Sequence, residues 1–379
     1  MDFKFTEEQL QVQQSSKDFA QSVLWHNVIE RDEKMLFPHH EIKQMGELGL
    51  MGMMTASKYG GSDMDTISYV LAMIEISKVD ASAGVCMSVN NSLYCWGLEK
   101  YGTDEQKQKY LTPVAKGEIL GAFALSEPEA GSDATSQHTT AEDCGDYYLL
   151  NGTKNWITNG GNATYYHVIA QTHKELGHKG INVLLVEKGM QGFEIGKKEN
   201  KLGIRASDTH SLMFNDVKVP KKNRIGDEGF GFKFAMETLN GGRIGIAAQA
   251  VGIAEGAYEL SKKYAKERKT FGKEIAQHQA IQFKLADMET QIEAAKLLCL
   301  KAAWLKDHGH DHAKAGAIAK LYASEVAMQV TIEAVQIHGG YGYVKDFHVE
   351  RMMRDAKITQ IYEGTSEIQR IVIARDILK

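Results

Sequence analysis

Three stretches of the sequence combine hydroxyl, amide, aromatic and carboxylate side chains in a way that core packing does not require: residues 121–136, 154–161 and 359–370. The first, GAFALSEPEAGSDATS, begins apolar and ends in a Gly/Ser/Asp turn. Its backbone N–H and hydroxyl groups could face an anion or a flat ring. A loop that only joins a helix to a strand would have the same composition, so both interpretations stay open here.

The other two stretches centre on one tryptophan and one glutamate. In KNWITNGG, Trp156 lies beside Thr158 and Asn159. Tryptophan is usually a core residue, but hydrogen-bonding neighbours also suit a wall against a planar cofactor. In KITQIYEGTSEIQR, Glu363 precedes Gly364 at the edge of a final helix. Taken alone, this position favours a capping or dipole role for the glutamate.

Common catalytic and metal-binding signatures are absent from the sequence. No GxGxxG after a strand, GxxxxGK[ST], GxSxG or HExxH occurs. The four cysteines, Cys86, Cys95, Cys144 and Cys299, are too few and too scattered for a disulfide framework, and we expect them to be buried. His308, His310 and His312 alternate in the polar run LKDHGHDHAK, which is more typical of a solvated loop than of a metal site, so we expect no metal.

Composition limits the classes of partner. The 379 residues are 43% hydrophobic and 25% charged, which fits two or three globular domains. A net charge of -5 disfavours nucleic acid as a partner. No apolar run reaches about 18 residues, so we expect no membrane insertion. The start resembles neither a secretory signal nor a transit peptide, so the expected location is cytoplasmic.

Helices are predicted at both ends of the chain. No proline follows Pro220, which permits long helices. One is expected from Gly242 to Glu267 and a last one from Ser366 onward. Apolar residues spaced by threes and fours predict two more, through Ile281, Leu285, Met288, Ile292, Ala295, Leu298, Ala302 and Leu305, and through Leu321, Met328, Ile332 and Val335 up to the break at Gly339.

Short runs punctuated by Gly and Asn predict strands in the middle of the chain, at 147–150, 167–172, 181–187, 193–196 and 211–219. The pair Asn151-Gly152 predicts a tight hairpin, and Pro220 is expected to end the last strand. The predicted fold is therefore α+β and mainly α: an N-terminal helical domain at 1–120, a central β-barrel-like domain at 121–225 and a C-terminal four-helix bundle at 226–379.

Seven motifs in this order resemble those of the acyl-CoA dehydrogenases: SVNNSLY, FALSEPEAGSD, KNWITNG, LNGGRIGIAAQAVG, RKTFGK, VQIHGGYGY and MRDAKITQIYEGTSEIQR. The resemblance runs from end to end, and it is closest to short-chain, butyryl-CoA-type members. It implies a homotetramer with FAD and the α,β-dehydrogenation of a short-chain acyl-CoA to a trans-2-enoyl-CoA. Glu363 would be the base, hydride would pass to flavin N5, and an electron-transferring flavoprotein would take the electrons.

The resemblance also implies contacts, residue by residue. FAD would be bound by Phe123, Ala124, Leu125, Ser126, Ser132, Trp156, Ile157, Thr158, Arg268, Phe271, Gln279, Gln336, Gly339, Gly340, Thr365 and Glu367. Of these, the residues from Arg268 to Gly340 would hold the pyrophosphate and adenine from a neighbouring subunit. The acyl-CoA would meet Ser132, Asn240, Arg243, Tyr362 and Gly364.

One position departs from the family pattern, and two other functions remain open. The family generally has aspartate where this chain has Asn240, so the CoA contact is expected to differ. An acyl-CoA oxidase would share the fold and the base but would let oxygen reach the reduced flavin. A non-catalytic helical binding protein would share the fold alone.

Overall fold

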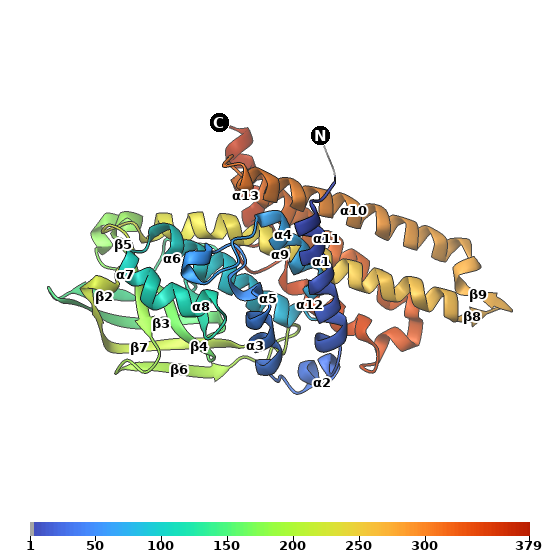
Figure 1. The fold of residues 1–379 in the computed structure, drawn as a ribbon, viewed down its shortest axis with the longest axis horizontal. Coiled ribbons are helices and arrows are strands. Elements are labelled where there is room, and N and C mark those ends of the chain that lie inside the picture. The colour runs from blue at the N-terminus through green and yellow to red at the C-terminus, as the bar shows by residue number, and fades with distance from the viewer. Residues whose placement is uncertain (1–3) are drawn as a thin grey trace.

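The computed structural model describes residues 4–379, in which helices, a β-sheet and further helices follow one another along the chain (Figure 1). The predicted order of helical, β and helical domains is confirmed. Among the described residues, no helix has the length and apolarity needed to cross a membrane.

The N-terminal region is a set of mostly short helices around one buried helix, α4. Its N-cap is Asp65, whose carboxylate accepts a hydrogen bond from the Ser68 N–H. α4 packs between α1 and the long C-terminal helix α9, which explains why it is buried on nearly all sides. The elements are α1 Glu7–Phe19, η1 Ala20–Leu24, α2 Val28–Glu33, α3 His39–Glu47, η2 Leu50–Gly52, η3 Ser57–Tyr59, α4 Thr66–Val79, α5 Ala81–Ser88, η4 Val89–Cys95, α6 Trp96–Tyr101, α7 Asp104–Gln106, η5 Lys107–Leu111 and α8 Thr112–Ala115.

The central region is one mixed sheet with the strand order β1-β4-β2-β3-β7-β6, to which β5 adds by pairing with β4. All five predicted strands are present as β3 to β7, while β1 and β2 were not predicted. The elements are β1 Leu120–Ala124, β2 Thr140–Asp143, β3 Tyr147–Thr158, β4 Ala163–Gln171, η6 Lys174–Gly180, β5 Ile181–Glu187, β6 Phe193–Lys198, β7 Thr209–Pro220 and η7 Lys221–Asn223.

The hairpin predicted at Asn151-Gly152 is wrong. These residues lie inside β3, where Gly152 has a φ of 140° and the register with β7 shifts. The pair therefore forms a β-bulge, which uses the same freedom of glycine as a turn does. The turn that does join β2 to β3 contains Gly145 and Cys144. Cys144 is exposed there, so the expectation of burial holds only for the other three cysteines.

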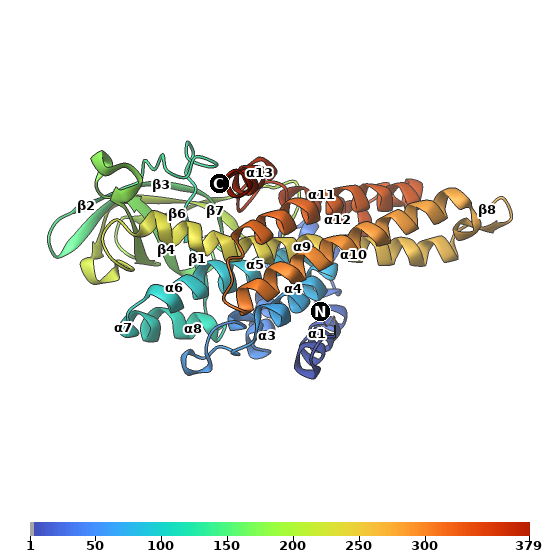
Figure 2. The same ribbon diagram turned by 90° about the horizontal axis from the view of Figure 1, so that it is seen from above.

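The C-terminal region is built on three long helices, α9, α10 and α11, which extend to the end of the molecule opposite the sheet (Figure 2). The residues of the predicted stripe on α10 are buried or half-buried. On α11 the buried face is made mainly of small residues such as Ala323 and Ala327, and Ile332 is exposed. Helix α12 was not predicted. The elements are α9 Gly231–Glu267, β8 Lys269–Thr270, β9 Lys273–Glu274, η8 Ile275–Gln277, α10 Gln279–Asp307, α11 Ala313–His338, η9 Gly339–Tyr343, α12 His348–Ile358 and α13 Ser366–Ile377.

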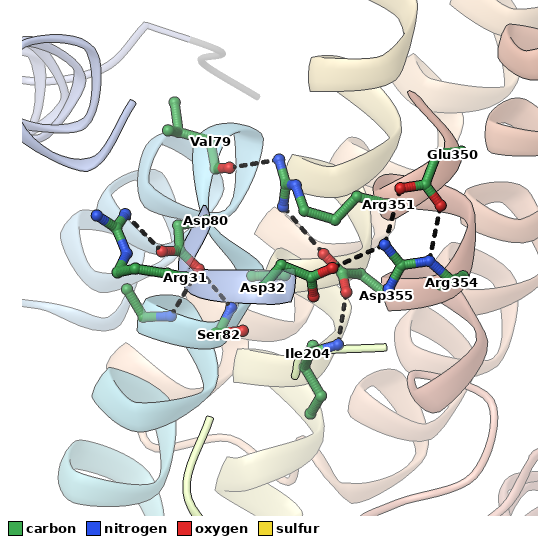
Figure 3. A network of polar contacts seen from close by, with 12 residues as sticks. Arg31, Asp32, Val79, Asp80, Ser82, Ile204, Glu350, Arg351, Arg354 and Asp355 are labelled. Carbon is green, nitrogen blue, oxygen red and sulfur yellow. Dashed lines mark hydrogen bonds and ion pairs between the residues drawn. The ribbon is translucent and has the colours of Figure 1, made fainter. Parts of the chain in front are cut away.

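A buried ionic network ties the three regions together (Figure 3). Arg354 of α12 donates to Asp32 of α2 at 2.7 Å, and Arg351 donates to the Val79 carbonyl at 2.9 Å. The Asp355 carboxylate accepts from the backbone N–H of Ile204, in the loop before β7, at 2.5 Å. The network therefore sets the position of α12, and of the loop that follows it, relative to both other regions.

Candidate functional site

Glu363 lies in the short loop between α12 and α13, in a strained backbone conformation. Its φ is 52° and that of Gly364 is 91°, a left-handed pair that few non-glycine residues enter. Such strain often marks a functional site. The N-cap of α13 is Thr365, whose hydroxyl accepts from the Ile368 N–H, so Glu363 is not the capping residue that its sequence position alone favoured.

Both carboxylate oxygens of Glu363 are buried, and neither has a hydrogen-bond partner among the described residues. Oε2 lies so close to Gly242 of α9 that a Cβ at that position would overlap it. Burial raises the pKa of Glu363 to about 7, against the opposing effects of Lys320 and Arg243. A buried acceptor without a donor destabilises the folded protein. A general base, however, needs such a free carboxylate oxygen to accept the substrate proton.

A second group of predicted residues forms the edge of the sheet. Phe123 and Ala124 end β1, and Leu125, Ser126 and Ser132 follow in the next loop. Lys154 of β3, a fully buried lysine, holds this loop against the sheet. It donates to the Glu127 carboxylate at 2.6 Å and to the Leu125 carbonyl at 3.1 Å. The same Glu127 carboxylate accepts from the backbone N–H groups of His138 and Thr139.

Trp156 stands next to this loop with a face open to solvent. The Asn155 N–H donates to the Ser126 carbonyl at 2.9 Å, which places the two stretches side by side. Trp156 has a φ of 62° at an irregularity of the β3–β7 ladder and is 61% exposed, which is unusual for tryptophan. Thr158 is partly exposed, whereas Ile157 is buried in the sheet. An open indole beside a rigid loop suits a planar ring system.

The π-helical segment η4 joins the sheet edge to Glu363. Its Asn90 accepts from the Gly121 N–H of β1 at 3.1 Å. Its Leu93 lies against Gly242, beside the Glu363 carboxylate, such that a Cβ on Gly242 would come within 2.8 Å of Leu93 Cδ2. The predicted substrate residues Tyr362 and Gly364 flank Glu363 in the chain. The other two, Asn240 and Arg243, lie in the same turn of α9 as Gly242. The structure thus gathers these residues in one region.

Six predicted FAD residues lie elsewhere. Arg268, Gly339 and Gly340 line a cavity of about 560 Å³, together with His338, Tyr341 and their neighbours. Phe271, in the β8–β9 turn, is 94% exposed, and Gln279 and Gln336 are also exposed. Figure 2 shows β8 at the far end of the long helices, away from β3. One chain therefore does not bring this cavity and Trp156 together.

Two buried lysines near these groups were missed by sequence reasoning. Lys320 of α11 is fully buried and donates to the Gly364 carbonyl at 2.6 Å. It interrupts a stripe of small buried residues on α11, which runs from Ala317 through Ser324 and Ala327. A charged residue inside such a stripe is a signal that could have found it. Lys154 gives the same signal as a lysine at an inward-facing strand position.

Family models match three successive parts of the chain. The acyl-CoA dehydrogenase N-terminal, middle and C-terminal domain models match residues 6–118, 122–217 and 229–378. A short-chain specific acyl-CoA dehydrogenase of Clostridium acetobutylicum is 51% identical over 379 residues, with 100% of both chains covered.

Solved structures show the same likeness. Butyryl-CoA dehydrogenase from Megasphaera elsdenii has a TM-score of 0.98 at 48% identity, and a chain in a structure of the electron transferring flavoprotein of Acidaminococcus fermentans has a TM-score of 0.99 at 51% identity; both cover 100% of this chain and of their own. An FAD complex of PigA superposes with a TM-score of 0.95 at 29% identity over 100% of this chain and 99% of that one. The chain belongs to the acyl-CoA dehydrogenase family.

Proposed function

We propose that the protein removes one hydrogen from each of carbons two and three of a short-chain acyl-CoA, butyryl-CoA being the expected substrate, and that it forms the trans-2-enoyl-CoA with FAD as cofactor. The observation that carries this proposal is the Glu363 carboxylate, which is buried and has no hydrogen-bond partner within residues 4–379, and whose pKa is raised by burial to about 7. A group of this kind suits the removal of a weakly acidic α-proton.

In this mechanism Glu363 acts in its charged form. It takes the proton from carbon two, and the electron pair left behind forms the double bond as a hydride leaves carbon three. Bound FAD would supply the acceptor for that hydride. Burial of the carboxylate beside Gly242 excludes water and so brings the proton affinity of Glu363 closer to that of the carbon acid.

The residues present fit FAD in two parts. The open face of Trp156, the Thr158 hydroxyl and the loop from Phe123 to Ser132 would hold the ring system. The cavity lined by Arg268 would hold the pyrophosphate, because a guanidinium binds phosphate oxygens well. Gly339 and Gly340 line the same cavity, and the space beside them is open, since a Cβ added at either would meet no other atom within 4 Å. Since the two parts lie at opposite ends of one chain, we infer that a second copy supplies the cavity. Thr365 and Glu367, at the N-terminus of α13, complete the proposed contacts.

Side chains along α9 support a short acyl group. Beyond Gly242, the Tyr69 hydroxyl and Ser88 hydroxyl come so close to Gly245 that a Cβ there would lie 2.5 and 2.7 Å from them. Farther on, the Gln249 amide accepts from the Tyr362 hydroxyl and donates to the Ala81 carbonyl at 2.8 Å. A long acyl chain would have to displace these bonded groups, so turnover is expected to fall from C4 to C8 thioesters.

The substitution Glu363→Gln tests the proposal. The amide keeps the shape but cannot accept the proton, so we expect a loss of butyryl-CoA turnover of about 10⁴-fold or more with FAD still bound. Substantial residual turnover would refute the assignment of the base. The same assay, run in air with peroxide detection and then with an electron-transferring flavoprotein, identifies the acceptor. We expect slow peroxide release and rapid transfer to the flavoprotein; the reverse would favour an oxidase.

A further inference from the structure

Two buried cations flank Glu363, and neither is paired with another carboxylate. Lys320 of α11 is fully buried and donates a hydrogen bond to the Gly364 carbonyl at 2.6 Å. Arg243 of α9 is 5% exposed, and its Nη1 donates to the uncharged amide oxygen of Asn240 at 2.6 Å. No ion pair within 4.0 Å involves either cation in residues 4–379. Burying two cations without carboxylate partners is costly, so a compensating negative group must lie close by.

Glu363 is that group. Each cation lowers the proton affinity of its carboxylate, which burial alone would raise further. Burial lowers the pKa of Lys320 to about 8 and also lowers the pKa of Arg243, and Glu363 opposes both shifts by favouring the charged forms. The other ionisable groups that act here are the Tyr69 hydroxyl of α4 and the Tyr362 hydroxyl of the same loop, with Glu325 and Glu367 acting on Lys320. The two cations are therefore the only positive groups in this set.

Lys320 also determines where the base points. The Gly364 carbonyl that it holds belongs to the left-handed Glu363–Gly364 pair, and Gln369 donates to the same carbonyl at 2.8 Å. A left-handed glutamate is unfavourable by itself and persists only where its surroundings hold it. Two hydrogen bonds to one carbonyl therefore hold the turn that aims the carboxylate at Gly242.

We propose that Lys320 and Arg243 form a two-cation cradle that orients Glu363 and keeps it charged, and that the neutral Asn240 leaves the charge of Arg243 free for this purpose. Lys320 and Arg243 are thus positioning residues that act through the base. The inference rests on the proposed role of Glu363. It adds a reason for Asn240, because an aspartate at this position would pair with Arg243 at 2.6 Å and withdraw its charge from Glu363.

The test reads the ionisation of Glu363 without turnover. The carboxylic acid stretch of Glu363 is followed by infrared titration of the FAD-loaded protein and assigned by its absence in Glu363→Gln. We expect Lys320→Met to raise the titration midpoint by about 1 pH unit or more, and Asn240→Asp to raise it in the same direction by less. Lys314→Met, on the same helix but at the surface beside Asp376, is the matched control and should leave the midpoint unchanged.

Turnover measurements distinguish the two roles of the cradle, which are keeping Glu363 charged and orienting it. High pH should recharge Glu363 in Asn240→Asp and restore its rate. Lys320→Met should stay about 10-fold to 100-fold slow on the high-pH plateau, because only the Gln369 hydrogen bond then holds its turn. Unchanged midpoints in both variants would overturn the proposal. If Lys320→Met does not fold, an unchanged midpoint in Asn240→Asp overturns it alone. An active Glu363→Gln would instead refute the function while leaving the infrared result readable.

Discussion

At the scale of single residues, the environment of Glu363 sets the pH range in which the protein can work. Burial raises the pKa of its carboxyl to about 7. The base acts when it is deprotonated, so kcat/KM for butyryl-CoA should fall about tenfold per unit as the pH drops below 7 and should level off above it. The measurement is a pH profile with α-deuterated substrate in parallel, which shows whether proton removal limits the rate. A flat profile from pH 5.5 to 9 (roughly, one to two units on either side of the expected pKa) combined with a full isotope effect would contradict this pKa.

A second prediction at the residue scale concerns Gly242, which lies against the Glu363 carboxylate. A methyl group at Gly242 would overlap Oε2 of Glu363 and come within 2.8 Å of Leu93 Cδ2. Gly242→Ala should therefore displace the base and lower kcat about 10-fold to 100-fold, since small misplacements of reacting groups are costly. FAD content should not change.

The adjacent residue provides the control for that experiment. A Cβ on Gly241 would meet only Lys306 Nζ, at 3.8 Å, which is ordinary contact. Gly241→Ala adds the same methyl group to the same helix and should keep normal turnover. Equal losses in the two variants would mean that the effect comes from α9 as a whole and not from contact with the base.

At the scale of elements, the buried pair Lys154–Glu127 holds the loop after β1 against β3. Lys154→Met removes the ammonium and leaves Glu127 buried with no cation, which typically costs about 3–5 kcal/mol. We expect a lower melting temperature and loss of FAD, because the loop would no longer keep its position beside Trp156. The FAD-to-protein ratio after gel filtration and a thermal melt measure these effects.

Two further variants separate loop anchoring from general damage. Lys218→Met, on the neighbouring strand β7, removes an exposed lysine that lies over the Tyr147 ring and should change neither quantity. In the double variant Lys154→Met/Glu127→Gln, no buried charge is left, so part of the stability should return. Retention of FAD in Lys154→Met would show that the loop holds its position without the pair.

Local pattern could predict most elements but few of their contacts. Spacing of apolar residues predicted α10 correctly, because Met288 and Ile292 are buried and large side chains such as Leu285 and Leu298 are half-buried on the same stripe. It predicted α11 as a helix but not its buried face, which consists mainly of small residues and carries Lys320, since small residues give little hydrophobic contrast. Asn151-Gly152 was misassigned because a bulge and a hairpin turn favour the same residues.

The candidate site shows the same limit. From the residues alone Glu363 looked like a helix cap, and only the resemblance named it as the base. Its burial, its left-handed backbone and its two flanking cations come from α9, α11 and α13, which are distant in sequence. Sequence spacing carries no record of such contacts, so the partners of the two buried lysines, Gly364 for Lys320 and Glu127 for Lys154, became visible only in three dimensions.

At the scale of the whole molecule, the two parts of the proposed FAD site lie at opposite ends of the chain. The sheet with Trp156 occupies one end, and the β8–β9 turn with Phe271 occupies the other, beyond the long helices (Figures 1 and 2). Apolar side chains on the outer faces of these helices, including Phe283, Leu297 and Ile332, are exposed in the single chain. Both features are explained if a second copy packs against this one and reaches its sheet with the far turn.

Mixing two inactive variants tests this arrangement directly. Glu363→Gln disables the half-site at the sheet, and Arg268→Ala/Phe271→Ala disables the half-site at the far turn. If each flavin lies between two chains, a mixed oligomer contains one intact site, built from the Glu363 of one variant and the Arg268 of the other. Random pairing of equal amounts should then restore about one quarter of the wild-type activity. If each chain holds its own flavin, every site in the mixture carries a defect, and co-expression should give no more activity than either variant alone.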